Sequence, residues 1–275
     1  MSDKKIIRPF TEKQRNNLSI DEYLRIEREF HDHYADECDW DEPVTDNLSY
    51  DRGIYGTEVE DYFLKLLGNV RGKKMLDIGS GHGNTALNLA MRGAEVTSID
   101  IAPRLIEGCR YRSTKHSIPV DFRVMDATKL EFPENTFDII VGFRTIHHLP
   151  NLEEFCVNAR RCLKQGGFLL LVEPQKYNPF VEVGRYFIKN KEDSRTPTEH
   201  PIVPKDIRLI KRTFGNLEKK EFELFKPMAL AFEMLKWPGI YKVLVRAFTV
   251  TDHTFWYLPF FRPLYWQVVM KAVKE

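Results

Sequence analysis

A glycine-rich loop follows a short apolar run that ends near an aspartate. The segment MLDIGSGHGN, residues 75–84, contains in order Asp77, Gly79, Ser80, Gly81 and Gly83. Glycines there let the backbone turn sharply and approach a ligand, and the amide groups at the start of a following helix favour polar or anionic ligand groups. A dinucleotide fingerprint of the form GxGxxG would require glycine at position 84, where the chain has Asn84. The loop predicts a ligand site, and the residues that follow must indicate which ligand.

Two more acidic residues stand where later strands are expected to end. Asp100 closes the run EVTSID, and Asp126 comes just after VDFRVM. A carboxylate at the end of the second strand can accept both hydroxyls of a ribose, which nicotinamide and adenosyl cofactors share. A carboxylate after the third strand can accept from the exocyclic amine of adenine. The structural alternatives are an N-cap for Asp100, an Asx-turn for Asp126 and acceptance of loop amides by Asp77.

Three further candidates for acid–base chemistry lie near the ends of the next two expected strands. The pair His147–His148 comes shortly after the fourth apolar run, and Glu173 ends the fifth. A histidine there could act as a general base, or its ring could form part of the wall of a site. Glu173 could be a base, accept a hydrogen bond from a substrate, or pair with a neighbouring arginine.

The segment EFHDHYADE, residues 29–37, concentrates side chains of the types that bind metals. Residues four apart share one face of a helix, but the pairs Asp32/Asp36 and His33/Glu37 point about 100° apart. Each face then offers two ligands at most, so the sequence predicts no metal site. A helix there could instead fold over a cofactor, with His31 or Tyr34 touching the substrate, or it could present a solvated acidic face.

The elements that must position these residues follow an alternating pattern from residue 73 onward. Short apolar runs alternate with helix-length segments, which is typical of βαβ units around a parallel sheet. Strands are expected at 73–79, 95–100, 120–125, 137–143, 168–173, 218–225 and 265–273. Helices are expected at 19–39, 57–69, 83–92, 103–115 and 151–164, the last closed by Gly166 and Gly167 as a C-cap. The predicted organisation is an N-terminal helical cap over 1–70 and a main domain over 71–275, with insertions at 174–215 and 227–262.

The composition is that of an ordinary folded protein. The 275 residues include 41 basic and 40 acidic side chains, for a net charge of +1, and the four cysteines form no CxxC pair. Disorder and a disulfide scaffold are excluded, and the cysteines indicate reduced thiols in a cytoplasmic protein. No run of about 18 uncharged apolar residues or secretory signal is present, so no membrane-spanning segment is expected. The sequence gives no indication of oligomeric state.

Four segments together resemble the class I S-adenosylmethionine-dependent methyltransferases, particularly their small-molecule branch. They are LDIGSGHGN, SID ending at Asp100, MDATKLEFPENTFDIIVGFRTIHHL and LKQGGFLLLVEP, which cover about residues 73–174. The resemblance implies an α/β fold: a Rossmann-like, doubly wound, seven-stranded sheet whose last strand is antiparallel. It also implies S-adenosylmethionine as cofactor, lying over the carboxyl ends of the first strands, and an enzyme that transfers its methyl group.

By position, the resemblance assigns parts of the cofactor to particular residues. The loop from Asp77 to Gly83 would hold the methionine part, Asp100 with Ile101 the ribose, and Asp126 with Ala127 the adenine. His147 would lie near the methionine end or the methyl group. Transfer from a sulfonium needs proximity and alignment more than acid or base assistance, unless the nucleophile has a high pKa. His147, His148 and Glu173 are therefore optional catalytic residues at this stage.

The acceptor is less well indicated than the cofactor. Residues 174–275 carry a net charge of +7, and ten large aromatic side chains lie within 237–266: Trp237, Tyr241, Phe248, Phe255, Trp256, Tyr257, Phe260, Phe261, Tyr265 and Trp266. These rings could line a pocket for an apolar acceptor with an anionic or polar group, pack a lid onto the sheet, or rest peripherally on a membrane. The expected acceptor is a small or lipid-like molecule.

Two other functions remain open on the sequence alone. One is a non-catalytic subunit or regulator that binds S-adenosylmethionine. The other is methylation of a macromolecule, either RNA or protein. Nucleic acid is not the expected partner, because the total charge is close to zero and the chain has FRTI where an NPPY-like tetrapeptide would follow the fourth strand.

Overall fold

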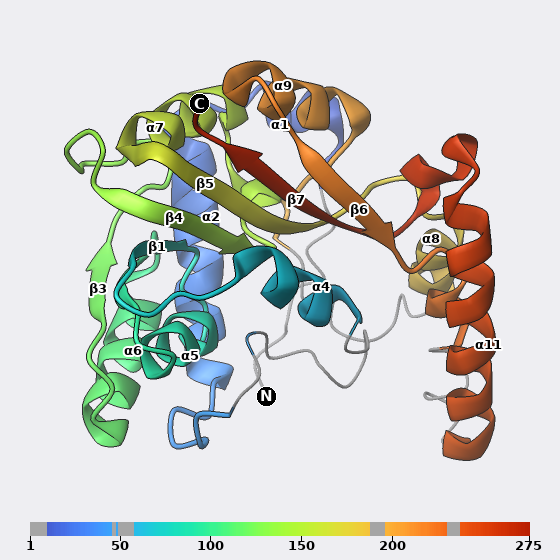
Figure 1. Ribbon diagram of the computed structural model, residues 1–275, viewed down its shortest axis with the longest axis horizontal. Helices are drawn as coiled ribbons and strands as arrows, with labels where there is room; N and C mark the ends of the chain where they lie inside the picture. Colours follow the sequence, from blue (N-terminus) through green and yellow to red (C-terminus); the bar gives the residue numbers. More distant parts are fainter. Residues whose placement is uncertain (1–9, 46–47, 49–57, 188–195, 230–236) are drawn as a thin grey trace.

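A seven-stranded sheet in the order β3-β2-β1-β4-β5-β7-β6 forms the centre of the molecule (Figure 1). The computed structural model describes residues 10–45, 48, 58–187, 196–229 and 237–275. The strands are Lys74–Ile78 (β1), Glu95–Asp100 (β2), Asp121–Val124 (β3), Phe137–Phe143 (β4), Leu163–Pro174 (β5), Glu218–Phe222 (β6) and Gln267–Val273 (β7). β7 runs antiparallel to both β5 and β6, and the other neighbouring pairs are parallel. The expected fold class is confirmed.

Helices cover both faces of this sheet, because its central strands are apolar on both sides. Four of the five residues of β1 are buried, and β4 is buried except at two positions. One face packs against Glu58–Leu67 (α4), Asn84–Met91 (α5) and Pro103–His116 (α6). The other packs against Leu152–Cys162 (α7) and Pro204–Phe214 (α9). Continuous apolar runs in parallel strands require such two-sided cover.

The fifth strand begins earlier than the sequence predicts. α7 ends at Cys162, and Leu163 is already extended and pairs with Phe137 of β4. Gly166 and Gly167 therefore do not cap the helix, as was expected, but lie inside β5. There the pairing with β4 shifts register, and Gly166 has a φ of +75°. Leu163 pairs with Phe137 and the Gly166 N–H donates to the Lys274 carbonyl at 2.8 Å, so the glycines form an irregularity within the strand instead of a helix end.

Two other predicted elements are shorter than expected. The helix predicted at 19–39 is Ile20–Tyr34 (α2), followed by a 3-10 turn at Ala35–Glu37 (η1), and the strand predicted at 218–225 ends at Phe222. α2 begins at Ser19, whose hydroxyl accepts from the Glu22 N–H while the Glu22 carboxylate accepts from the Ser19 N–H. A short helix at Glu12–Asn16 (α1) precedes it. The differences concern ends of elements, where local pattern says least.

The N-terminal helices lie in different places in the fold. α2 packs against α6, where the Asp32 carboxylate accepts from the Arg104 N–H and Asp36 pairs with the Arg104 guanidinium. α4, by contrast, contributes Phe63 and its neighbours to the core beneath the sheet. The segment 1–70, expected to form one helical cap, is thus divided in the described structure between a helix against α6 and a helix of the main core.

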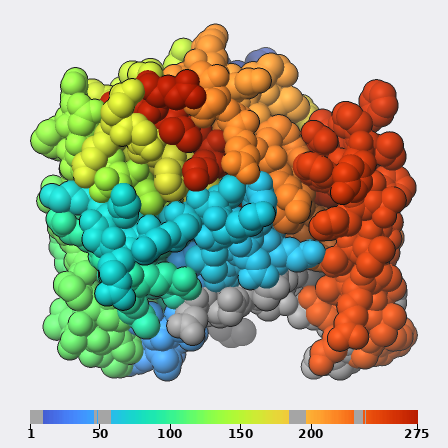
Figure 2. Space-filling view, viewed as in Figure 1, coloured from blue at the N-terminus to red at the C-terminus, as the bar shows by residue number. Residues whose placement is uncertain are grey.

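The C-terminal insertion stands at the far edge of the sheet, beyond β6. It comprises Lys226–Ala229 (η3), Pro238–Trp256 (α11) and Pro259–Leu264 (η4), and α11 packs against η3, which also contacts Pro179–Phe187 (α8). Figure 2 shows α11 as a column along one side of the molecule. Among the described residues, none of the helices combines the length and the apolar content needed to cross a bilayer.

The docking of the N-terminal segment onto α6 can be tested at Gly108. A Cβ at this position would lie 2.4 Å from ring atoms of Trp40, whose indole N–H donates to the Ala35 carbonyl at 3.1 Å. Gly108→Ala should lower the free energy of unfolding by about 1–2 kcal/mol, because the overpacking outweighs the gain in helix propensity. Urea unfolding would measure it.

Gly239→Ala is the matched control, because Gly239 also lies in a helix and has open space around its Cβ position. This variant should be as stable as the wild type or more stable by up to about 1 kcal/mol. Equal effects of the two substitutions would contradict the proposed contact between Trp40 and α6.

Candidate functional site

A cavity of about 190 Å³ lies at the carboxyl ends of the first four strands and is covered by α2. Its floor comes from the loops after β1, β2, β3 and β4. Its lining residues are Leu24, Glu27, His31, Tyr34, Gly79, Gly81, Ile99, Asp100, Ile101, Leu105, Met125, Asp126, Ala127, Phe143, Arg144, Thr145, His148 and Leu149. In an α/β sheet of this kind, ligands bind outside the carboxyl ends of the strands.

The glycine loop follows β1 and is shaped by the loop after β4. Gly79 has a φ of +74°, and a Cβ there would lie 2.3 Å from the Thr145 hydroxyl oxygen. That hydroxyl donates to the Ile78 carbonyl at 2.9 Å, so the two loops are packed directly together. Only glycine meets both demands at position 79. The loop backbone consequently forms an open wall of the cavity.

Three of the predicted cofactor residues lie behind this wall. Asp77 is buried and accepts a hydrogen bond from the Ser98 hydroxyl at 2.7 Å, and burial raises the pKa of Asp77 to about 7. The hydroxyl oxygens of Ser80 and Ser98 are also 2.7 Å apart. Gly83 caps α5, with its Cβ position 3.0 Å from the Cys109 sulfur. In the structure these residues support the loop and do not line the cavity.

Asp100 faces the cavity from the end of β2. Its two carboxylate oxygens accept from the backbone N–H groups of Gly81, at 3.2 Å, and Ala102, at 3.0 Å. The helix N-cap of α6 is Ala102, so the side chain of Asp100 is not the N-cap residue considered as an alternative. The two amides hold the carboxylate in place beside Ile101, which lines the cavity as well.

Asp126 forms the Asx-turn considered for it and also borders the cavity. One carboxylate oxygen accepts from the Thr128 N–H at 2.8 Å, which is an Asx-turn. The same residue also lines the cavity together with Ala127. The turn fixes the direction of the carboxylate and leaves it next to the cavity.

Glu173 and His147 form a buried pair behind the cavity. One Glu173 oxygen accepts from the N–H groups of Thr145 and Ile146, at 2.8 and 2.9 Å, and the other lies 2.6 Å from His147 Nδ1. Burial raises the pKa of Glu173 to about 7 and lowers that of His147 to about 3, so the ring is neutral at pH 7. Neither residue lines the cavity. The pair fixes the turn of residues 144–148.

Of the three predicted acid–base candidates, His148 lines the cavity, whereas His147 and Glu173 do not. His148 lies in the 3-10 turn Ile146–His148 (η2) and meets Glu27 and His31, which are one turn apart on α2. The Glu27 side chain is 3% exposed. Although burial opposes it, the rings of His148 and His31 hold the pKa of Glu27 below its ordinary value. An ionised carboxylate thus lies between two imidazoles at the edge of the cavity.

Sequence reasoning named His31 and Tyr34 on this helix but missed Glu27 and Leu24. All four line the cavity, as expected for a helix that folds over a ligand. Their spacing of three, four and three residues places them on one helical face, so helical periodicity could have found the set. Arg144 and Thr145, also missed, could be found only from the packing of the loop after β4 against the glycine loop.

The two insertions contribute differently to this region. Thr196 and Thr198, in the segment after α8, both donate to the Glu27 carboxylate and so support α2 from behind. None of the ten C-terminal aromatic side chains lines the cavity. They stand on the β6 side of the sheet, whereas the cavity lies over the β1–β4 side. The suggestion that these rings line the acceptor pocket is therefore wrong for this cavity.

The part of the chain that forms the floor of this cavity is similar to known methyltransferases. Residues 76–171 match the family described as a methyltransferase domain. Demethylmenaquinone methyltransferase of Tropheryma whipplei (strain Twist) is 35% identical over 117 residues, which are 42% of this chain and 48% of that protein. Ubiquinone biosynthesis O-methyltransferase of Chromobacterium violaceum is 31% identical over 109 residues, 39% and 47% of the two chains. The matched region spans about half the length of these curated relatives.

A solved structure has the same fold over a longer stretch. Phosphoethanolamine N-methyltransferase 2 of Haemonchus contortus, in complex with phosphomonomethylethanolamine and S-adenosylhomocysteine, is similar with a TM-score of 0.56 at 22% identity. The match covers 80% of this chain and 53% of that chain, and at this identity it shows the fold. The glycine loop, Asp100 and Asp126 all fall inside the family match. Over residues 76–171 the chain is therefore similar to the methyltransferase domain family, and its fold is that of class I S-adenosylmethionine-dependent methyltransferases.

Proposed function

We propose that the protein transfers the methyl group of S-adenosylmethionine to a small-molecule acceptor. The observation that carries the proposal is that one cavity joins Asp100 and Asp126 on one side to His31 and His148 on the other. A single cavity suits a reaction between two bound molecules when residues expected to bind the cofactor line one side of it and imidazoles line the other. The relatives named for demethylmenaquinone and for ubiquinone biosynthesis support an acceptor with a quinone-like or phenolic ring.

The cofactor in this proposal lies along the carboxyl ends of β1 to β3. The backbone of the loop at Gly79 and Gly81 contacts the methionine part, and Asp100 accepts from the ribose hydroxyls. Asp126 and Ala127 contact the adenine. Asp100 is suited to its role because two backbone amides already fix its carboxylate, so little conformational freedom is lost on binding. The supporting residues Asp77, Ser80 and Gly83 act through the loop.

The acceptor enters on the α2 side of the same cavity. Leu24 and Tyr34 provide apolar surface there, and His31, His148 and Arg144 provide polar groups. The chemistry is an in-line displacement: the acceptor atom forms a bond to the methyl carbon while the carbon–sulfur bond breaks and its electron pair goes to sulfur. Alignment of the two molecules supplies most of the rate in such a reaction. A hydroxyl acceptor must also lose its proton.

Cofactor binding is tested at Asp100. Asp100→Ala should weaken the binding of S-adenosylmethionine and S-adenosylhomocysteine about thirtyfold, because a charged acceptor of two hydrogen bonds is lost, on the order of 2 kcal/mol. Titration calorimetry measures both ligands. Glu95→Ala is the matched control, since Glu95 begins the same strand with its side chain exposed at the opposite edge. Unchanged affinity in a folded Asp100→Ala protein, or preference for NAD, would refute the assignment.

The acceptor side is tested at His148. His148→Ala should reduce kcat for transfer of labelled methyl groups to hydroxylated ring compounds by at least about 100-fold, because its imidazole lines the acceptor side of the cavity and misplacement of a bound acceptor has effects of this size. Its Kd for S-adenosylmethionine should stay within about threefold, because Asp100 and the loop are untouched. His33→Ala, on the outer face of α2, should behave as the wild type. Transfer to RNA or protein in preference to these compounds would overturn the proposed acceptor class.

The Glu173–His147 pair is proposed to position the turn that carries Arg144 to His148. Glu173→Gln keeps one acceptor for the amides of Thr145 and Ile146 but replaces the carboxylate facing His147. We expect kcat to fall about tenfold with little change in cofactor Kd, since displacement of a positioning group by a fraction of an ångström has such effects. An equal loss of cofactor affinity would show that the pair supports the whole fold instead.

Peripheral contact with a membrane is also proposed, through α11. Ile240, Val243, Val250 and Tyr257 are exposed at helical spacing on one face of α11. Lys242 and Arg246 are exposed on the same helix. An exposed apolar stripe with basic neighbours is typical of helices that lie in a membrane interface and prefer anionic lipids. A quinone-like acceptor would be available at such a surface.

This contact is tested by sedimentation with vesicles. Val243→Asp should reduce binding to vesicles of phosphatidylglycerol and phosphatidylcholine at least fivefold, because a charge enters the apolar stripe. Val157→Asp, on α7, changes another exposed valine away from α11 and should have no effect. Binding that is absent in the wild type, or lost equally in both variants, would remove the membrane contact from the proposal.

A further inference from the structure

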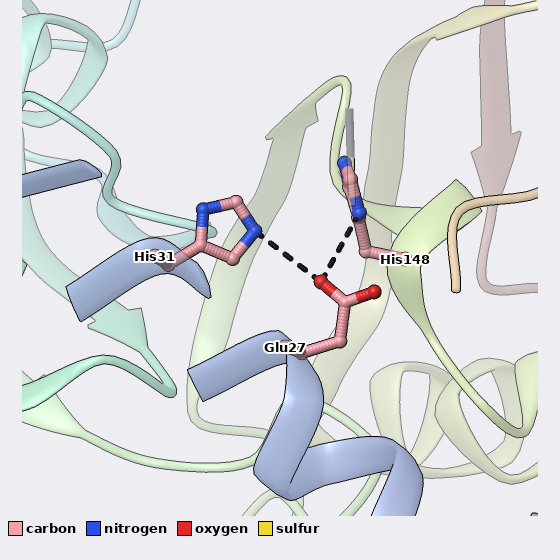
Figure 3. A group of neighbouring side chains, drawn as sticks. All are labelled: Glu27, His31 and His148. Atoms are coloured by element: carbon pink, nitrogen blue, oxygen red, sulfur yellow. Dashed lines mark ion pairs between the residues drawn. The ribbon is translucent and has the colours of Figure 1, made fainter. Parts of the chain in front are cut away.

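A buried carboxylate and two imidazoles converge at the edge of the cavity (Figure 3). Glu27 Oε2 lies 3.3 Å from His31 Nε2 and 3.2 Å from His148 Nδ1. The three groups come from α2 and from η2, which lie more than a hundred positions apart in the chain. In Figure 3 both rings direct a nitrogen toward the same carboxylate oxygen. Three groups of the types that bind transition metals thus face one small region.

The two separations from Glu27 Oε2 match those of ligands around one tetrahedral ion, and the ligand atoms of all three residues lie within 4.8 Å of one another. Nitrogen and oxygen ligands lie about 2.0–2.2 Å from zinc, which places neighbouring ligand atoms roughly 3.3 Å apart. Glu27 Oε2 has no partner of acceptable hydrogen-bond geometry within the described structure. A buried carboxylate oxygen without such a partner is costly. A cation between the three groups would satisfy it. His148 Nδ1 also lies 3.1 Å from the Thr196 hydroxyl oxygen, a contact that an ion at this nitrogen would replace.

The other oxygen of Glu27 is held by two hydroxyl groups. Thr196 Oγ1 donates to Glu27 Oε1 at 2.9 Å, and Thr198 Oγ1 donates to the same atom. Carboxylates that bind metals are commonly fixed in this way by hydrogen bonds to the oxygen that does not bind. The threonines therefore orient Oε2 toward the histidines.

A second group of possible ligands shares His148 and adds His147 and Glu199. It is the weaker candidate, because His147 Nδ1 is engaged with Glu173 and neither His147 nor Glu199 lines the cavity. Glu27, His31 and His148 all line it. An ion bound by these three would keep a coordination position open toward bound ligands.

We propose that Glu27, His31 and His148 bind one divalent transition metal ion, for which zinc is the best match. Two histidines, one glutamate and an open position are a ligand set of catalytic zinc sites. The further role of the ion rests on the proposed function. At the open position the ion would lower the pKa of an acceptor hydroxyl, whose proton would pass to solvent. The oxygen would then bond to the methyl carbon while the carbon–sulfur bond breaks and its electron pair goes to sulfur.

Metal binding is tested without any methyl-transfer assay. The full chain, freed of metal with a chelator and dialysed, is titrated with Zn²⁺ against a chromophoric competitor and by calorimetry. We expect one ion per chain with a Kd below about 1 μM. His31→Ala and His148→Ala should each weaken binding at least 100-fold, and Thr198→Val by about 10- to 100-fold through loss of an orienting hydrogen bond.

Two controls keep the test decisive. His33→Ala removes an exposed histidine from the same helix and should retain wild-type affinity. Glu27→Gln serves as a third ligand variant, and circular dichroism shows whether it folds. The His31 side chain is 27% exposed, so His31→Ala remains informative if Glu27→Gln does not fold. Absence of binding at one ion per chain, or equal binding by His31→Ala, His148→Ala and wild type, would overturn the site.

The role of the ion is separated from the proposed function by a second measurement. Metal-free and zinc-loaded protein are compared for binding of S-adenosylmethionine and for methyl transfer. Equal cofactor binding with at least 100-fold faster transfer by the zinc-loaded form is expected. Equally fast transfer by both forms would overturn the role of the ion but leave the proposed function standing. Zinc binding without transfer under any condition would support the site and refute the function.

Discussion

The buried, ionised carboxylate of Glu27 is the group on which the α2 side of the cavity depends. A charge removed from water costs several kcal/mol unless other groups compensate it. Here His31 comes from the same helix, His148 from the turn after β4, and Thr196 and Thr198 from the segment after α8. The carboxylate can be buried only when these three segments are in place together. Its requirements therefore fix the position of α2 over the strand ends.

The cofactor side of the cavity depends on a different contact, which meets the first at the turn after β4. Thr145 occupies the space that a side chain at position 79 would need, and its hydroxyl donates to the Ile78 carbonyl. Glu173 holds the same turn through two backbone amides. Because Thr145 and His148 belong to one short turn, a displacement of the glycine loop would also move the imidazole that faces the acceptor side. The two halves of the cavity are thus mechanically coupled.

The parts of the structure that could be predicted from sequence are those set by local pattern. The alternation from residue 73 onward indicated where the core strands lie along the chain, and the loop at Gly79 with Asp100 and Asp126 marked the edge of the sheet that borders the cavity. Glu27 escaped notice because a glutamate in an acidic helix resembles a solvated residue, and its burial results from partners more than a hundred positions away. The bulge at Gly166 was missed for a related reason. Local sequence suggests a helix cap, whereas pairing with β4 decides the outcome.

The docking of α2 over the strand ends and the formation of the cavity depend on the same contacts. The ion pair between Asp36 and Arg104 is exposed, and pairs of that kind contribute at most about 1 kcal/mol. Three buried or partly buried contacts also form only when α2 is docked: Trp40 against Gly108, the Tyr23 hydroxyl donating to the Thr198 carbonyl, and the compensated charge of Glu27. A ligand that touches both Asp100 and His31 binds only this docked state, so it stabilises α2 by mass action. If the cofactor and the ion bind as proposed, their binding and the docking of α2 are one linked equilibrium.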